Sequence, residues 1–358
     1  LIKLFMKTTI LSSGGFNPGH VSHLLAFKKM LNEQDFSVQF LCNENYSEFS
    51  SDIQAGTVGI WYCLSKLKKD DVFIVWSPSI VSLVHCLLLR LFCRCELLYV
   101  YHEPFESLRS YTDAGFSKQD ILRFFLISIV SCLKCVLSTL VILPSLKAKA
   151  AFDASFIGRK NNIKLNLIFD DEAGETNLGE KKYISYIGTI AKDHAFYEFV
   201  DLVSQICRDN LLPDVEFLVC TKSSIPKDCI SKIEKCVNAG RLTVVSGKPM
   251  RTDEINDYYA KSLVIWNAYK RSMQSGVLPK AYMFGVPVIT SLSGSSEYFV
   301  SDSTGLAISS DYKLDDFVDA ISSILASFPK YSLSARAYFL ENFYYKALSG
   351  QFLKGLNS

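Results

Sequence analysis

Residues 266–288, WNAYKRSMQSGVLPKAYMFGVPV, give the clearest indication of the fold. The apolar run that ends at Trp266 predicts a strand, and Ser275-Gly276 predicts the start of a helix. Gly285 predicts the end of that helix, and Val286–Val288 predicts the start of another strand. A strand, a helix and a second strand in this order are typical of a parallel sheet.

The same alternation of apolar runs and helix-like stretches extends through both halves of the chain. In the first half we expect strands at Thr8–Ser12, Phe36–Cys42, Val72–Trp76 and Glu96–Tyr101. In the second half we expect them at Tyr183–Ile187, Val215–Cys220, Leu242–Val245, Leu263–Trp266 and Val286–Thr290. Largely apolar strands are typical of sheets covered on both faces. We therefore predict an α/β protein with two Rossmann-like, doubly wound domains that face each other across a cleft.

The length and composition support two domains. The chain has 358 residues, which is longer than a domain with a single hydrophobic core usually is. Its 49% hydrophobic content excludes a disordered chain. The polar segment Asp170–Lys182 interrupts the alternation and predicts a boundary. We expect an N-terminal domain at 6–169 and a C-terminal domain at 182–330. A helical segment at 331–358 could pack back on the first domain.

Charge and cysteine content exclude several classes of protein. Lys and Arg number 38 against 36 Asp and Glu, which gives no general attraction to nucleic acid. The close pairs Cys93/Cys95 and Cys132/Cys135 have no matching second half, so we expect no zinc site among the 11 cysteines. Reduced, buried thiols are typical of a cytosolic protein.

The segment Ile121–Leu143 is almost wholly apolar and has three interpretations. A buried helix followed by a strand is favoured, because Ser138-Thr139 divides the segment. A helix on the membrane surface, with Arg123 and the nearby lysines 134, 147 and 149, is the second. A membrane span is the third. Leu1–Phe5 is too short for a signal peptide, and Met6 is the expected natural start.

Ligands of parallel sheets bind at the carboxyl ends of the strands, and two such ends in the first half carry suggestive residues. The loop Gly14–His20 contains Gly15, where a ligand could approach the backbone closely, together with the polar residues Asn17 and His20. His102 and Glu103 follow the fourth apolar run, where they could orient a hydroxyl or move a proton. A tight turn and an ordinary polar loop remain the simpler alternatives.

Two strand ends in the second half suggest a phosphate site. Gly188, Thr189 and Lys192 suit a diphosphate, although an exposed lysine is often only solvated. The amides of Ser275, Gly276 and Val277 open a helix and would present N–H groups with the positive end of the helix dipole. Such an arrangement favours a diphosphate without any metal ion.

These landmarks together resemble a known family. Residues 182–328 are similar to the nucleotide-sugar-binding half of GT-B glycosyltransferases, most of all glycosyltransferase family 4. The similarity rests on Tyr186–Gly188, Asp253–Tyr259, Gly285–Val288, Ser293–Glu297 and Thr304–Leu306, in this order. The first half matches only in layout, through its glycine-containing loop and the loop at His102.

The resemblance implies that 6–169 is the acceptor-binding domain, with Asn17 and His20 on the acceptor side, and that 182–330 is the nucleotide-sugar-binding domain. It also implies a position for each part of the donor. The loop after Gly188 and the amides of Ser275–Val277 would hold the diphosphate, and Gly247-Lys248-Pro249 would lie beside the base. His102 would lie near the sugar, and Gly15 near the diphosphate. The family typically transfers sugars with retention of the anomeric configuration and needs no bound metal or other cofactor.

The sequence departs from the family pattern at the donor site. Two glutamates eight positions apart are replaced by Ser272 and Lys280. Thr189 occupies the position where the family often has an arginine after the glycine. His194 aligns with the family's lysine, and Lys192 is nearby in the sequence. Substitute contacts could come from Tyr269, Gln274 and Lys280.

We therefore expect a glycosyltransferase that moves a sugar from a nucleotide-diphosphate donor to a hydroxyl of a growing bacterial surface glycan of the O-antigen type. The acceptor is expected to be lipid-linked, at the inner face of the cytoplasmic membrane. His102, Glu103 and Lys192 are the catalytic candidates, and helix-end amides with Lys192 or Lys280 would stabilise the leaving oxygens. A non-catalytic partner subunit and a nucleotide-sugar 2-epimerase are the alternatives; the missing glutamates favour the former.

Overall fold

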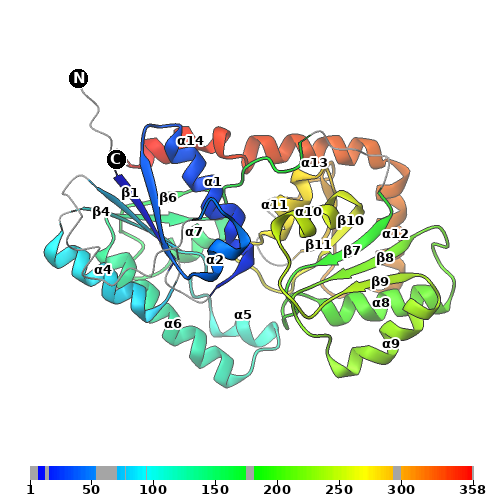
Figure 1. The fold of residues 1–358 in the computed structure, drawn as a ribbon. Coiled ribbons are helices and arrows are strands. Elements are labelled where there is room, and N and C mark those ends of the chain that lie inside the picture. Colours follow the sequence, from blue (N-terminus) through cyan, green and yellow to red (C-terminus); the bar gives the residue numbers. More distant parts are fainter. Residues whose placement is uncertain are drawn as a thin grey trace. The chain divides into compact units, whose positions relative to one another are not determined.

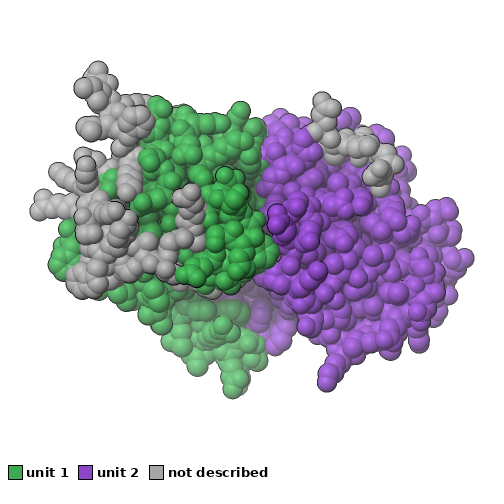
Figure 2. All heavy atoms as spheres, viewed as in Figure 1, with its two compact units in different colours: residues 1–109, 117–170, 342–358 green, residues 110–116, 171–341 purple. Residues whose placement is uncertain are grey.

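The computed structural model describes residues 7–12, 16–53, 71–76, 78–93, 95–174, 181–292 and 300–356. The chain forms two compact units, which Figure 2 shows in different colours. Unit 1 comprises residues 1–109, 117–170 and 342–358, and unit 2 comprises residues 110–116 and 171–341. The chain therefore leaves unit 1 near residue 170 and returns to it for the last helix.

Unit 1 is built on a six-stranded parallel sheet in the order β2-β1-β3-β4-β5-β6. Its strands are β1 (Lys7–Ser12), β2 (Ser37–Cys42), β3 (Val72–Val75), β4 (Glu96–Val100), β5 (Leu140–Leu143) and β6 (Asn162–Lys164). The short helices η1 (Pro18–His20), α2 (Asn45–Phe49) and α5 (Leu108–Asp113) follow strands; the end of α5 belongs to unit 2.

Helices cover both faces of this sheet (Figure 1). One core contains side chains of α1 (Val21–Asn32) and α14 (Tyr345–Leu356), and the other contains side chains of α4 (Ile80–Phe92), α6 (Lys118–Leu137) and α7 (Leu146–Asp153). The Tyr345 hydroxyl of α14 donates to Glu33 at 2.5 Å. A Cβ on Gly355 would lie 2.6 Å from Ile163, so glycine permits α14 to lie close to β6.

Unit 2 repeats the architecture with the order β12-β11-β10-β7-β8-β9. Its strands are β7 (Tyr183–Ile187), β8 (Glu216–Cys220), β9 (Leu242–Val245), β10 (Ser262–Asn267), β11 (Val288–Ser291) and β12 (Gly305–Ile308), all parallel. Its helices are α8 (Phe196–Arg208), α9 (Lys227–Asn238), α10 (Thr252–Ala260), α11 (Val277–Met283), α12 (Leu314–Ala326) and α13 (Phe328–Asn342).

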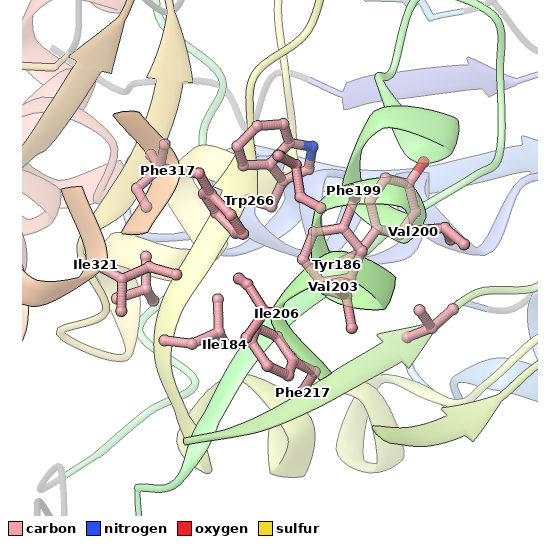
Figure 3. Close-up of a cluster of buried hydrophobic side chains, with 14 of the residues drawn as sticks. Ile184, Tyr186, Phe199, Val200, Val203, Ile206, Phe217, Trp266, Phe317 and Ile321 are labelled. Carbon is pink, nitrogen blue, oxygen red and sulfur yellow. The ribbon is translucent and has the colours of Figure 1, made fainter. Parts of the chain in front are cut away.

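Aromatic side chains fill the core of unit 2 (Figure 3). Trp266 of β10 packs edge-on against Phe317 of α12, with ring centroids 5.0 Å apart. Its indole N–H donates to the carbonyl of Ala195 at 3.0 Å, which satisfies the polar atom of a buried tryptophan. Ala195 has a left-handed backbone (φ 53°) and precedes α8. The core therefore fixes where α8 begins relative to the end of β10.

The fold class predicted from the sequence is confirmed: two parallel α/β sheets with helices on their faces. The apolar runs are strands, and α11 begins after Gly276 and ends before Gly285, whose φ of 60° favours glycine.

The apolar segment Ile121–Leu143 forms a helix, α6, and a strand, β5, as the favoured interpretation predicted. The expectation that the helix is buried is wrong, because Leu122 and Leu126 are 58% and 55% exposed. Polar and small side chains face the sheet instead. Among the described helices, none is both long enough and apolar enough to cross a membrane.

Candidate active site

The loops that follow β7, β8 and β9 are joined at the carboxyl edge of the unit 2 sheet. The amide of Gly188 donates to the carbonyl of Cys220 at 3.0 Å, and the amide of Ile190 donates to the Ser223 hydroxyl at 3.1 Å. The amide of Gly247 donates to the carbonyl of Ser223 at 3.2 Å. These backbone contacts hold the three loops as one surface where ligands of parallel sheets bind.

Gly188 lies against the start of α11. Its φ is 143°, a conformation that other residues rarely adopt. A Cβ at this position would lie 3.4 Å from Val277 Cγ2 and 3.6 Å from the Tyr269 hydroxyl. The loop after β7 and the N-terminus of α11 are therefore neighbours, as the predicted diphosphate site requires.

Tyr269 and His194 form a stacked pair beside this point. Their ring centroids are 4.2 Å apart and the rings are within 4° of parallel. His194 Nδ1 lies 2.7 Å from the carbonyl of Thr189. Because a carbonyl can only accept, Nδ1 carries the proton. Burial raises the pKa of Tyr269, so its hydroxyl stays neutral and can donate a hydrogen bond.

The N-terminus of α11 is exposed at Gly276, which has an ordinary helical φ of −74°. The Val277 amide donates to the Ser275 hydroxyl at 3.3 Å, and that hydroxyl lies 3.4 Å from Asn267 Oδ1. Asn267 is fully buried at the end of β10. It links this turn to the sheet, a contribution that the sequence analysis did not identify.

A second unpredicted contact involves Arg271, which is only 6% exposed. Its guanidinium lies 4.2 Å from the centroid of the Tyr111 ring, and Nη2 donates to the Tyr111 hydroxyl at 3.1 Å. The neighbouring Ser272 hydroxyl donates to the carbonyl of Gln274 at 2.6 Å. Arg271 lies within residues 266–288, but no pattern in the neighbouring sequence indicated a partner 160 residues away.

Lys280 is paired with residues other than Gly188, Tyr269 and Ser275. It is 7% exposed, forms an ion pair with Glu172 and donates to Asn256 Oδ1 at 2.7 Å. Burial lowers the pKa of Lys280, and the Glu172 carboxylate opposes that effect. The geometry therefore gives Lys280 an internal role, in place of the donor contact that the sequence suggested.

The remaining donor-side candidates lie on the loops of the same edge. Thr189 and Lys192 are exposed on the segment between β7 and α8, and Gly247–Pro249 is exposed after β9. Gln274 is half-buried before α11. The structure therefore gathers Gly188, Tyr269 and Ser275–Val277, and leaves Lys192 and Lys248 on the loops around them.

Unit 1 gathers a separate cluster at the carboxyl edge of its own sheet. His20 and His102 stack with centroids 6.1 Å apart, and Trp76 packs against His102 at 4.9 Å. Asn17 Nδ2 lies 3.2 Å from His20 Nε2. Since an amide nitrogen only donates, Nε2 of His20 accepts. Three residues predicted from two distant loops, Asn17, His20 and His102, thus come together.

Two other predicted residues of unit 1 are not part of this cluster. Glu103 follows His102 and is exposed. Gly15 lies outside the described residues, as does the landmark Ser293–Glu297. Over the described part of the chain, no three His, Cys, Asp or Glu side chains are grouped as a metal site would need.

The comparison with protein families identifies the second half. Residues 181–327 match a family model described as glycosyl transferases group 1. This part of the chain is similar to group 1 glycosyl transferases. The matched range coincides with the region whose landmarks suggested this activity, and the prediction of a glycosyltransferase is confirmed. No curated protein sequence matches the chain.

Solved structures of glycosyltransferases share the fold over nearly the whole chain. HepE of Anabaena, in complex with UDP and glucose, is 14% identical with a TM-score of 0.73, covering 98% of this chain and 99% of that chain. Sucrose-phosphate synthase from Thermosynechococcus elongatus is 15% identical with a TM-score of 0.69, covering 98% and 99%. The pneumococcal O-GlcNAc transferase GtfA, in complex with UDP and GlcNAc, is 10% identical with a TM-score of 0.67, covering 99% of both. This likeness confirms the GT-B fold.

Proposed function

We propose that the enzyme transfers a sugar from a nucleotide-diphosphate donor to a hydroxyl of a growing glycan. The observation that carries the proposal is the close approach of Gly188 to Val277 and Tyr269, beside the exposed Gly276. Backbone amides at a helix start, with a glycine loop opposite, suit a diphosphate. UDP is present in the similar structures of HepE and GtfA, so a UDP-sugar is the first donor to test.

The difficult step is the departure of the nucleoside diphosphate while positive charge develops on the sugar. In the proposed site, the amides of Ser275 and Gly276 stabilise the charge on the leaving oxygens, and the turn is held in place before the reaction by the Val277 amide, which donates to the Ser275 hydroxyl. The Tyr269 hydroxyl is a neutral donor in the same place. Lys192 is the nearby cation on the loop after β7. The proposal needs no metal ion, and it leaves out Lys280.

His102 is the residue we assign to the reacting sugar, with Glu103 as a second candidate. His102 has the two properties that such a role needs: it follows a strand end, and aromatic packing against Trp76 and His20 fixes its ring. Asn17 and His20 would then lie on the acceptor side. We propose retention of the anomeric configuration, in keeping with the family 4 resemblance.

The acceptor is proposed to be a lipid-linked glycan of a bacterial surface polysaccharide, with the enzyme bound at the inner face of the cytoplasmic membrane. The exposed apolar residues of α6 support this part of the proposal. They are consistent with an enzyme that works at a lipid surface rather than on a freely diffusing acceptor.

The donor site is tested by Gly276→Asp. A carboxylate here would lie beside the diphosphate, and two like charges 4 Å apart repel by about 4 kcal/mol at an effective dielectric constant of 20. We therefore expect the affinity for UDP, measured by calorimetry, to fall at least about a hundredfold. Asparagine has nearly the same size as aspartate but no charge, so Gly276→Asn should lower the affinity for UDP far less. Undiminished UDP affinity in the aspartate variant would show that the diphosphate does not bind at this helix end.

The role of His102 is tested by His102→Ala. General acid–base catalysis typically contributes about 10²–10⁴-fold, so we expect kcat for sugar transfer to fall by at least about a hundredfold. The Kd for UDP should change little, because the assigned contact is with the sugar. Equal losses in kcat and nucleotide affinity would place His102 in donor binding instead.

A further inference from the structure

Two helices of unit 1 together present a wide apolar surface. α4 and α6 pack against each other on one face of the sheet (Figure 1). Their outward side chains, here called the apolar face, are Ile80, Val81, Val84, Leu87, Leu91 and Phe92 of α4, and Leu122, Phe125, Leu126, Ile129, Leu133 and Val136 of α6. Each is between 43% and 70% exposed. Spacings of three and four residues place the α6 members on one side of the helix.

Hydrogen bonds on the inner side fix this orientation. The Tyr99 hydroxyl of β4 donates to Ser131 at 3.1 Å, and the Tyr101 hydroxyl lies 3.4 Å from that of Ser128. Lys134 is fully buried and donates to Ser82 of α4 at 2.8 Å. Rotating α6 to bury its leucines would break these bonds and leave buried polar groups unsatisfied. The apolar face is therefore a stable feature of unit 1.

The charges on the two helices indicate what covers this face. The exposed charged residues of α4 and α6 are all cationic: Arg90, Lys118 and Arg123. The single acid of the two helices, Asp120, is half-buried and accepts from the amide and hydroxyl of Ser117. An apolar helix surface with a basic border is typical of helices that lie in a membrane interface.

We propose that the apolar face of α4 and α6 docks on an anionic lipid bilayer. Its leucine, isoleucine and phenylalanine side chains enter the boundary of the acyl chains, and Arg90, Lys118 and Arg123 meet headgroup phosphates. A second copy of the chain fits less well, because the same face on both partners would oppose cations without an exposed carboxylate on either helix. The inference rests on the membrane location within the proposed function and deepens it, because it names the surface and the kind of lipid that give access to a lipid-linked acceptor.

The test is co-sedimentation of the full chain with vesicles of phosphatidylglycerol and phosphatidylethanolamine. We expect the wild type to bind these vesicles, less tightly at high salt because the cationic contacts are screened. Leu122→Gln/Leu126→Gln should weaken the partition coefficient by about tenfold or more, since lipid binding scales with the apolar area inserted. Leu333→Gln, at a residue of unit 2 that is 68% exposed, is the matched control and should bind as the wild type does.

A second variant keeps the test independent of any one substitution. Arg90→Glu/Arg123→Glu should also weaken binding to the anionic vesicles, and added salt should no longer weaken that binding further, because repulsion has replaced the cationic contacts. No vesicle binding by the wild type at low salt, or unchanged binding by both double variants, would overturn the proposal. So would a wild type that is dimeric in sedimentation velocity while Leu122→Gln/Leu126→Gln is monomeric, since that would make the face an interface between copies.

UDP calorimetry on the same proteins separates the two proposals. The double variants should keep the wild-type affinity for UDP, because their changes lie on α4 and α6 of unit 1. Vesicle binding without affinity for any nucleotide would contradict the proposed function and leave the docking surface standing. Nucleotide affinity without vesicle binding would overturn the docking surface and the proposed membrane location, and it would leave the proposed sugar transfer standing.

Discussion

Helices α8 of unit 2 and α6 of unit 1 bury opposite kinds of side chain. α8 turns its apolar residues to the core, and those buried are Phe196, Phe199, Val200, Leu202, Val203 and Ile206. α6 buries Ser128, Ser131, Lys134 and Cys135, and its Leu122, Leu126 and Leu133 face outward. Each helix has one apolar side, so the apolar pattern identifies the helix and its sides. It does not say whether that side meets the sheet or an external partner.

The largest expected difference concerns a matched pair of leucine truncations. Leu202 of α8 is 6% exposed and Leu126 of α6 is 55% exposed. Leu202→Ala should lower the free energy of unfolding by about 2–5 kcal/mol, because it leaves a cavity in the core. Leu126→Ala should change it by no more than about 0.5 kcal/mol. Urea unfolding followed by circular dichroism measures both values.

Similar losses for the two leucines would break the comparison. They would mean that Leu126 is packed against protein in solution. A leucine of unit 1 that does belong to a core, Leu98, provides the internal reference because it is fully buried in β4.

A smaller effect is expected from the buried lysine of α6. Burial lowers the pKa of Lys134 to about 8 from its ordinary 10.5. Between these two pH values the unfolded chain binds more protons than the folded one, so the free energy of unfolding should rise with pH from about 8 to about 10.5. Below pH 8 the folded protein carries the cost of a buried ammonium group.

Lys134→Met should remove that cost. We expect the variant to unfold at higher urea concentration than the wild type at pH 7, with the difference shrinking as the pH approaches 10. Lys118→Met, at an exposed position of the same helix, should follow the wild type at every pH. A constant difference between Lys134→Met and the wild type would show that the ammonium group does not titrate in this range.

Local sequence predicted the elements and the sheet edge where we propose the site. Gly285 predicted the end of α11, and the resemblance implied that the loop after Gly188 lies near Ser275–Val277; both glycines have backbone conformations that favour glycine. Asn17, His20 and His102 were predicted because parallel strands end at one edge of a sheet. These inferences depend on neighbouring residues and on topology, which the sequence carries directly.

Long-range pairing could not be predicted in this way. Lys280 was expected to contact the donor, but its ammonium group meets Glu172, 108 residues away. Arg271 pairs with Tyr111 across 160 residues. The orientation of α6 depends on the hydroxyls of Tyr99 in β4 and of Tyr101 just after it, which a pattern within α6 does not contain. Such contacts are decided by the assembled core and not by the local propensity of any segment.

The return of α14 to unit 1 has a consequence for biosynthesis. Residues of α14 contribute to the same core as α1 and β1, and Tyr345 binds Glu33 across 312 residues. The ribosome therefore releases most of unit 1 before the helix that completes it has been made. During that interval α1 lacks its partner, and the nascent chain carries an uncovered apolar surface that chaperones can recognise. The half of the molecule that is translated first is thus finished last.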